Sequence, residues 1–152
     1  MTSGRGELHA IVGERLRGVG QRYTANRRVL VEGLLAAGGP VSIGDLLLRK
    51  GSVPQSSAYR NLAVLEQANV VRRVITDDDF ARFELDEGLT EHHHHLVCSN
   101  CGRIEDVEVP ANVERSLGRS LDRLAKGAGF ASVAHRLDLI GLCRTCAAAA
   151  SA

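Results

Sequence analysis

Two Cys-x-x-Cys pairs constrain the fold of this chain more than any other feature. The sequence contains four cysteines, and all of them fall in the pairs Cys98/Cys101 and Cys143/Cys146. Two such pairs typically form one closed tetrahedral zinc site, in which all four ligands are thiolates. Residues 102–142 lie between the pairs, a longer segment than a compact zinc ribbon contains. We therefore expect a small domain to fold between the two halves of the site.

Four consecutive histidines, residues 92–95, lead into the first pair. A purification tag or a solvated polar loop are alternatives, but the run is internal and histidine is the commonest metal ligand. Side chains alternate between the two faces of a strand, so His93 and His95 are expected on one face and His92 and His94 on the other. One run of histidines can therefore supply two separate metal sites.

The charge of the chain is distributed unevenly. Residues 1–75 hold eleven Lys and Arg against five Asp and Glu, whereas residues 76–152 hold eight against thirteen. A basic first half indicates a polyanionic partner, and an acidic, histidine-rich second half indicates cations. The sequence shows neither a long apolar run nor a signal leader, and thiol-rich metal sites are typical of reducing compartments. We therefore expect a cytoplasmic protein with no membrane contact.

The first half has the pattern of several helices followed by a hairpin. Apolar spacing predicts a helix from about Leu8, and the cap and stop signals predict helices that begin after Thr24, after Ser42 and at Pro54. Two strands, 70–75 and 81–85, follow around the acidic turn 77–79. This order is typical of a winged helix-turn-helix.

The helix predicted over 54–68 has two distinct faces. Ala58, Leu62 and Leu65 share one side and are expected in the core, whereas Ser56, Tyr59 and Arg60 lie on the other side. The second face is either an ordinary solvated surface or the surface that enters a DNA groove, and the basic charge favours DNA. The candidate DNA-contacting residues are Arg22, Tyr23, Arg27, Ser56, Ser57, Tyr59 and Arg60, with Arg28, Arg72 and Arg73 as further basic candidates.

The second half predicts strands over 94–98, 103–107 and 133–140, with a helix that begins at Pro110. One helix cannot cover both faces of a three-stranded sheet, so we expect a second copy of the chain to cover the rest in a homodimer. The fold class is α+β, a winged helix-turn-helix followed by a small α/β dimerisation domain with a three-stranded antiparallel sheet. The expected boundaries are 1–85 for DNA binding, 86–91 for a hinge, 92–146 for metal binding and dimerisation, and 147–152 for a disordered tail.

Three motifs of the chain resemble one known family over residues 8–146. They are HHHH-L-x-C-x-x-C-G, a histidine at 135 eight residues before the second cysteine pair, and S-x-Y-R with R-x-T-x-x-R upstream. Together they resemble the ferric uptake regulator family. The resemblance implies an N-terminal winged helix that binds operator DNA, a C-terminal domain that dimerises, and divalent metal that couples the two.

The resemblance also implies roles for individual residues. The structural zinc ligands would be Cys98, Cys101, Cys143 and Cys146. A regulatory site holding zinc or iron would use Glu84, His93 and His95, and an additional site would use His92, His94, Glu114 and His135. Tyr59 and Arg60 would contact bases and backbone, and Arg22 would approach the minor groove. The alternatives are that Glu84 is a surface residue of the wing, that Glu114 is a favourable charge at a helix N-terminus, and that His135 is a hydrogen-bonded histidine of the sheet.

The chain departs from the iron-type pattern at two positions. Pro40 stands where that pattern has a histidine ligand, and His94 stands where many members have aspartate. Zinc-sensing members often have an all-histidine run together with additional Cys or Asp ligands from the wing, and Asp86 and Asp77 are the candidate substitutes for those ligands here. Because a nitrogen-rich cluster suits zinc, nickel and iron, we expect a zinc- or iron-responsive repressor of metal homeostasis genes, with a peroxide sensor as the alternative.

Two other classes of function are weaker alternatives. A zinc hydrolase requires an open coordination position and a general base, for which Glu91 or Glu84 are candidates, but no H-E-x-x-H motif is present. A zinc-ribbon scaffold without DNA binding does not explain the basic first half. We therefore predict that the protein is not an enzyme.

Overall fold

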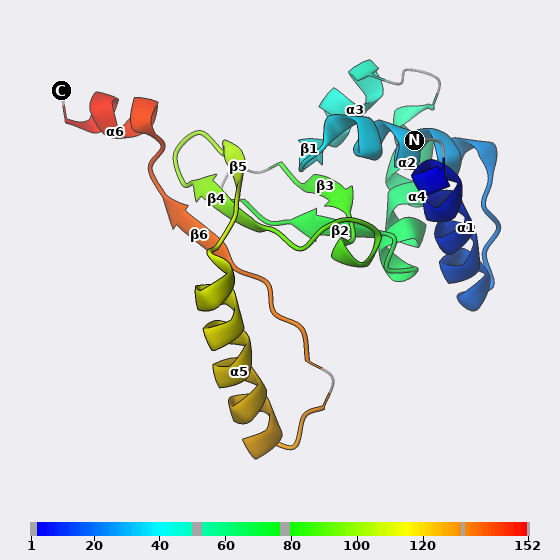
Figure 1. Cartoon of the computed structure of the whole chain (residues 1–152). Helices are drawn as coiled ribbons and strands as arrows, with labels where there is room; N and C mark the ends of the chain where they lie inside the picture. Colours follow the sequence, from blue (N-terminus) through cyan, green and yellow to red (C-terminus); the bar gives the residue numbers. More distant parts are fainter. Residues whose placement is uncertain (1–2, 50–52, 77–79, 132, 152) are drawn as a thin grey trace. The chain divides into compact units, whose positions relative to one another are not determined.

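The computed structural model describes residues 3–49, 53–76, 80–131 and 133–151 (Figure 1). The chain divides into two compact units, Met1–His92 and His93–Ala152, and each is considered by itself. The elements of the first unit are α1 (Ser3–Gly18), α2 (Ala25–Ala37), β1 (Val41–Ser42), α3 (Ile43–Arg49), α4 (Gln55–Gln67), β2 (Val71–Val74), β3 (Arg82–Leu85) and the short 3-10 helix η1 (Glu87–Leu89).

Local sequence signals determine where the helices of the first unit begin and end. The Thr24 side chain caps α2 by accepting a hydrogen bond from the Arg27 N–H, and Gly38 ends this helix with φ of 68°. The Ser42 hydroxyl accepts from the Asp45 N–H at 3.1 Å and so caps α3. Asn69 follows α4 with φ of 54°, the left-handed conformation that asparagine tolerates better than most residues. The structure confirms these predicted helix boundaries to within a few residues.

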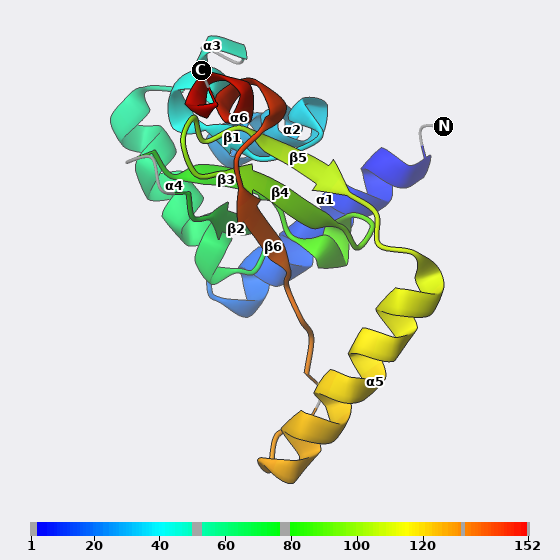
Figure 2. The same ribbon diagram turned by 90° about the vertical axis from the view of Figure 1, so that its left-hand side faces the viewer.

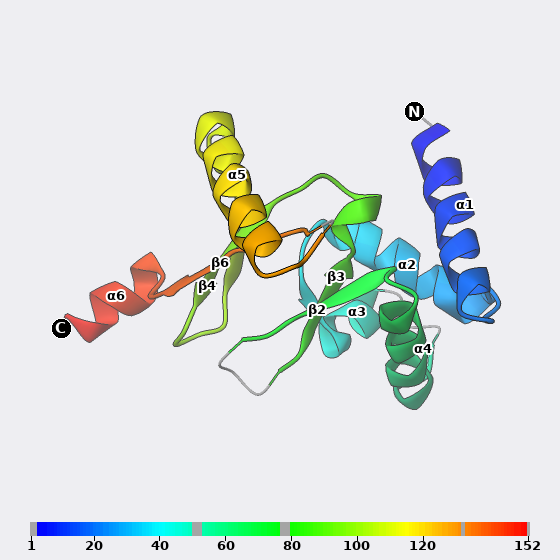
Figure 3. The same ribbon diagram turned by 90° about the horizontal axis from the view of Figure 1, so that it is seen from below.

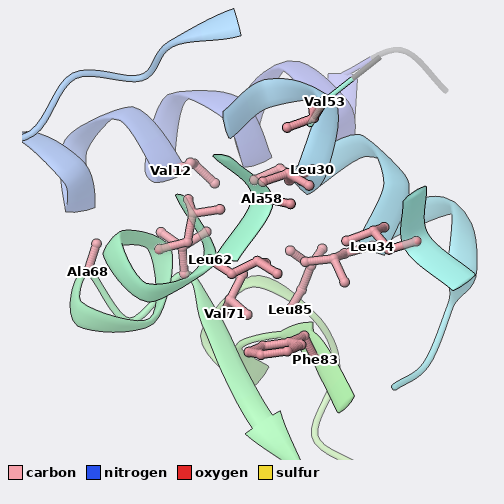
Figure 4. Close-up of a cluster of buried hydrophobic side chains, with 14 of the residues drawn as sticks. Val12, Leu30, Leu34, Val53, Ala58, Leu62, Ala68, Val71, Phe83 and Leu85 are labelled. Atoms are coloured by element: carbon pink, nitrogen blue, oxygen red, sulfur yellow. The ribbon is translucent and has the colours of Figure 1, made fainter. Parts of the chain in front are cut away.

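The sheet of the first unit has three antiparallel strands in the order β1-β3-β2, one strand more than the predicted hairpin. Helices α2 and α4 pack against β3 and β2, respectively (Figure 3). Figure 4 shows the core between these layers, with side chains from α2 (Leu30, Leu34), α4 (Ala58, Leu62) and β3 (Phe83, Leu85). The predicted acidic turn 77–79 lies outside the described residues.

The second unit contains β4 (His94–Cys98), β5 (Ile104–Val107), α5 (Ala111–Gly127), β6 (Asp138–Gly141) and α6 (Arg144–Ala150). Its sheet has the order β5-β4-β6, so the histidine-bearing strand β4 is central (Figure 2). Gly102, with φ of 69°, allows the tight turn between β4 and β5.

The sheet of the second unit is mixed, so the prediction of a wholly antiparallel sheet is wrong. Strand β5 is antiparallel to β4, whereas β6 is parallel to it, with Cys98 opposite Gly141. The positions of the four cysteines explain this direction. Each cysteine pair begins at or just after the end of a strand, so the two strands must end at the same edge of the sheet for the pairs to meet. Helix α5 and the segment that follows it carry the chain back to make this parallel pairing.

Residues 144–150 form α6, where the sequence suggests a disordered tail from residue 147. Alanine has the highest helix propensity, and Cys143 holds the N-cap position of this helix. In the described part of the chain, no helix is both long enough and apolar enough to cross a membrane.

Candidate metal centres and nucleic-acid interface

The structure brings the four cysteines together at one end of the β4–β6 pair. Their sulfur atoms all lie within 4.8 Å of one another, and Cys101 Sγ lies 3.8 Å from Cys143 Sγ. Tetrahedral zinc with bonds of about 2.3 Å places its sulfurs about 3.8 Å apart, so this cluster could hold a zinc ion after only small shifts of its side chains. The last residue of β4 and the turn after it contribute one pair, and the start of α6 contributes the other.

Hydrogen bonds to sulfur favour a thiolate at one of these positions. The Cys143 N–H donates to Cys98 Sγ at 3.3 Å, and this bond, followed by that of the Cys101 N–H, lowers the pKa of the Cys98 thiol to about 6. At Cys146 the Asn100 amide lowers the pKa, but the neighbouring Cys143 thiol and burial outweigh it, and the pKa rises to about 11. The cluster therefore holds negative charge at neutral pH, which a cation stabilises.

A second cluster lies on one face of β4. Glu114 in the first turn of α5 spans two histidines, with its Oε2 atom 2.9 Å from His94 Nε2 and its Oε1 atom 2.8 Å from His135 Nε2. The two imidazole rings stack with centroids 5.4 Å apart, and the His94 side chain is buried. Two imidazoles and a carboxylate with converging atoms are a donor set that suits zinc or iron. Glu114 therefore does more than place a charge at a helix N-terminus.

The adjacent histidines use the opposite face of β4. The rings of His93 and His95 meet edge to face, with centroids 5.1 Å apart. The Nδ1 atom of His95 lies 3.0 Å from Asp138 Oδ1 on β6, and its Nε2 atom lies 3.8 Å from Asp106 Oδ1 on β5. Neighbouring histidines thus have different partners, as strand alternation predicts. Sequence reasoning missed both aspartates.

Glu84 and His92 belong to the first unit. Glu84 lies on β3 and is buried, which excludes a surface position, and its carboxylate pairs with the buried Arg72 opposite it on β2. Arg72 also contacts Glu87, whose other oxygen lies 2.8 Å from His92 Nδ1. Arg72 is therefore a buried partner of two carboxylates and not the exposed DNA contact that the sequence suggests.

The predicted DNA-binding face of α4 is accessible. Ser56, Tyr59 and Arg60 are exposed, whereas Ala58 and Leu62 on the other side are buried in the core. Ser57 is half-buried, and its hydroxyl accepts a hydrogen bond from the Asn61 amide at 3.1 Å. The exposed face thus offers hydroxyl, phenol and guanidinium groups, which suit phosphates and base edges.

The two arginines among the predicted contacts near the start of α2 differ in exposure. Arg22 is exposed, but the Arg27 side chain is buried and donates to the Arg22 carbonyl, to Gln21 Oε1 at 2.9 Å and to Asn61 Oδ1 at 3.0 Å. The guanidinium of Arg27 therefore joins the segment before α2 to α4.

Tyr23 is half-buried and joins α1 to α2. Its hydroxyl lies 2.7 Å from His9 Nδ1, and the guanidinium of the exposed Arg28 lies 4.7 Å from its ring centroid. Burial raises the pKa of Tyr23 to about 12; Arg28 opposes this effect, whereas Glu32 reinforces it. The ring of Tyr23 thus supports Arg28 at the surface.

Residues 18–140 match the family model described as the Ferric uptake regulator family. The chain belongs to this family. The peroxide operon regulator of Bacillus subtilis (strain 168) is 30% identical over 138 residues, which cover 88% of this chain and 89% of that protein. The ferric uptake regulation protein of Bordetella parapertussis is 33% identical over 101 residues, which cover 66% and 68%, respectively.

Solved structures of related regulators share the fold. The ferric uptake regulator from Pseudomonas aeruginosa, solved with manganese, has a TM-score of 0.68 and 25% identity, covering 86% of this chain and 96% of that one. A zinc-bound manganese uptake regulator has a TM-score of 0.59 and 27% identity, covering 90% and 98%. This family consists of transcription regulators, so the chain is a metal-responsive transcription regulator and the hydrolase alternative has no support.

Proposed function

We propose that the protein is a homodimeric repressor that binds operator DNA when zinc or iron occupies its regulatory site. The observation that carries this proposal is the set of donor clusters around β4: four thiols at its end, the Glu114-linked histidines on one face, and the His93–His95 pair on the other. The exposed face of α4, with Tyr59 and Arg60, is the DNA-reading surface of the proposal. A reducing cytoplasm would keep the thiols available for zinc.

The four cysteines would hold a structural zinc ion that joins the end of β4 to the start of α6. In the second unit few apolar side chains are buried, and α5, described in full, buries none of its residues. Such a unit has little core of its own, so zinc would supply much of its folding free energy. The exposed apolar side chains of α5 and β6, among them Val113, Leu124 and Ile140, support a dimer that covers them.

The regulatory site would consist of His93 and His95 of the second unit with Glu84 of the first. The support is the proximity of the two imidazoles and the burial of the Glu84 carboxylate. Metal shared by both units would favour one arrangement of the dimer and so place two recognition helices at the spacing of operator half-sites. By linkage, DNA would increase metal affinity by the same factor.

The metal at this site is proposed as zinc ahead of iron. Imidazole nitrogens suit both ions, and Pro40 removes the third-helix histidine of the iron-type pattern. A peroxide-sensing regulator with iron at the same histidines is the second candidate. One observation favours it, namely that the 30% identical relative from Bacillus subtilis is a peroxide operon regulator.

The test is metal-dependent DNA binding by the intact protein. An operator would first be selected from random duplexes, and elemental analysis would establish one structural zinc per chain. Fluorescence anisotropy would then follow operator binding during separate anaerobic titrations with zinc and ferrous iron. We expect one metal to increase affinity at least tenfold, and His93→Ala to abolish the increase while the structural zinc remains. Affinity that ignores both metals would contradict the proposal, and loss of the iron-dependent increase after peroxide treatment would favour the second candidate.

A further inference from the structure

We propose that Asp138 is a positioning residue that orients the His95 imidazole so that its Nε2 atom is the one that binds metal. This inference rests on the proposed function, in which His95 is a ligand of the regulatory site. Its basis lies entirely within the second unit and is the 3.0 Å contact between His95 Nδ1 and Asp138 Oδ1.

The register of the sheet creates this contact. In the parallel β4–β6 pair, His95 is directly opposite Asp138, and the His95 N–H donates to the Leu137 carbonyl at 3.3 Å. Side chains opposite each other on neighbouring strands point to the same face and lie within reach of one another. The carboxylate is therefore held beside the ring by backbone pairing as well as by its own side-chain conformation.

The contact determines which nitrogen carries the proton. An ionised carboxylate only accepts hydrogen bonds, so the Nδ1 atom of His95 must carry the hydrogen. A neutral imidazole with hydrogen on Nδ1 has its lone pair on Nε2, the form that binds a metal through Nε2. Asp106 Oδ1 lies 3.8 Å from Nε2, which is beyond hydrogen-bond distance.

The surroundings of the His95 ring make the choice of tautomer important for metal binding. The His95 side chain is only 2% exposed and its ring meets that of His93, so the imidazole has little room to reorient when metal arrives. A carboxylate that binds the second nitrogen of a metal-bound histidine fixes its tautomer and raises its basicity, and loss of such a partner typically weakens metal binding about 10- to 100-fold. The Asp138 side chain is 43% exposed, so its replacement removes no core packing.

The experiment follows the His95 ring itself in the full-length protein. The chain would be labelled with ¹⁵N-histidine, keep its structural zinc, and be freed of other metal by mild chelation. Long-range ¹H–¹⁵N spectra would report the tautomer of His95, assigned by its loss in His95→Ala, and zinc titration would give the affinity at that ring. The variants are Asp138→Leu, which removes the acceptor, and Asp138→Asn, which removes the charge at nearly constant shape.

Glu105→Gln is the matched control, because it removes one carboxylate from the neighbouring strand β5, where Glu105 is opposite Leu96 and pairs with Arg103. We expect wild type and the control to show hydrogen on Nδ1. In Asp138→Leu we expect a mixture of tautomers and zinc affinity 10- to 100-fold weaker, with a smaller loss in Asp138→Asn.

An unchanged tautomer in both Asp138 variants overturns the inference, even if zinc affinity falls, because the effect would then be one of charge alone. Unchanged affinity in both variants overturns it as well. If zinc affinity in His95→Ala equals that of wild type, His95 is not a ligand and the proposed regulatory site fails, whatever tautomer Asp138 selects. The two failures are therefore distinguishable.

Discussion

Substitution of Arg27 separates a structural role from a DNA contact. The buried guanidinium donates three hydrogen bonds, to the Arg22 carbonyl, Gln21 and Asn61. Arg27→Met keeps most of the aliphatic stem but removes all three, and at about 1 kcal/mol each the first unit should lose about 3 kcal/mol of unfolding free energy. The neighbouring Arg28→Met is the matched control, because Arg28 is exposed and its contact with the Tyr23 ring contributes about 0.5–1 kcal/mol.

The sequence provides a convenient probe for this measurement. It contains no tryptophan and two tyrosines, Tyr23 and Tyr59, both in the first unit, so tyrosine fluorescence reports on that unit alone. Urea unfolding followed by this signal gives the free energy for each variant. Salt titrations of binding to random-sequence duplex DNA give the number of phosphate contacts, since each contributes about 0.9 to the slope of log K against log salt.

We expect Arg27→Met to unfold at lower urea while the folded variant keeps the wild-type salt slope. Arg28→Met should keep its stability to within about 1 kcal/mol and lose about 0.9 of the slope per subunit. The opposite pattern, with a stable Arg27→Met variant and a shallower slope, would show that the arginine leaves its buried position to bind phosphate. The positioning role argued from its three acceptors would then be wrong.

Four further predictions concern the metal centres and the core. Removal of zinc by a strong chelator should abolish the far-ultraviolet circular dichroism of the second unit but leave the urea transition reported by tyrosine fluorescence, because the first unit has its own core. Glu114→Gln should weaken zinc binding at His94 about tenfold or more in a competition assay, whereas Glu105→Gln should leave it unchanged. The pKa of Tyr23 is about 12 in the folded protein and about 10 when unfolded, because burial disfavours the ionised phenolate. Relative to the ionised ring, the neutral ring therefore favours the folded state, and this stabilisation is fully present below pH 10. This stabilisation, about 1 kcal/mol after screening at a half-exposed ring, is lost between pH 10 and 12, and the Tm of Tyr23→Phe should show a correspondingly weaker dependence on pH over this range. Leu62→Ala should cost the first unit about 2–5 kcal/mol by urea unfolding, because Leu62 is almost fully buried, whereas the exposed Leu48→Ala should cost less than about 0.5 kcal/mol.

Local signals made the helices of the first unit predictable. Thr24 and Ser42 have side chains that satisfy the first N–H groups of a helix, and Asn69 tolerates the left-handed conformation that ends one. Each signal acts within a few residues, so it can be read without knowledge of the fold. The alternation of His94 and His95 was predictable for the same reason, since it depends only on the strand geometry.

The partners of these histidines were harder to predict from the sequence, because they depend on strand register. Asp138 meets His95 only because β6 runs parallel to β4, and an antiparallel arrangement was predicted instead. The direction could have been inferred from the cysteines, since both pairs begin at or just after the ends of strands and must meet. Arg72 was misread for a related reason, because a charged residue in a strand is usually solvated, and only the pairing with Glu84 across β2 and β3 explains its burial.

The parallel register also restricts how the length of this protein can vary. Four residues, 139–142, separate Asp138 from Cys143, and the thiol cluster anchors one end of this segment while His95 pairs with the other. Because side chains alternate along a strand, one residue more or fewer would turn position 138 to the opposite face while the four cysteines stayed together. Insertions are therefore tolerable in the loop after α5 but not in this segment, where the spacing is as much a part of the site as its ligands are.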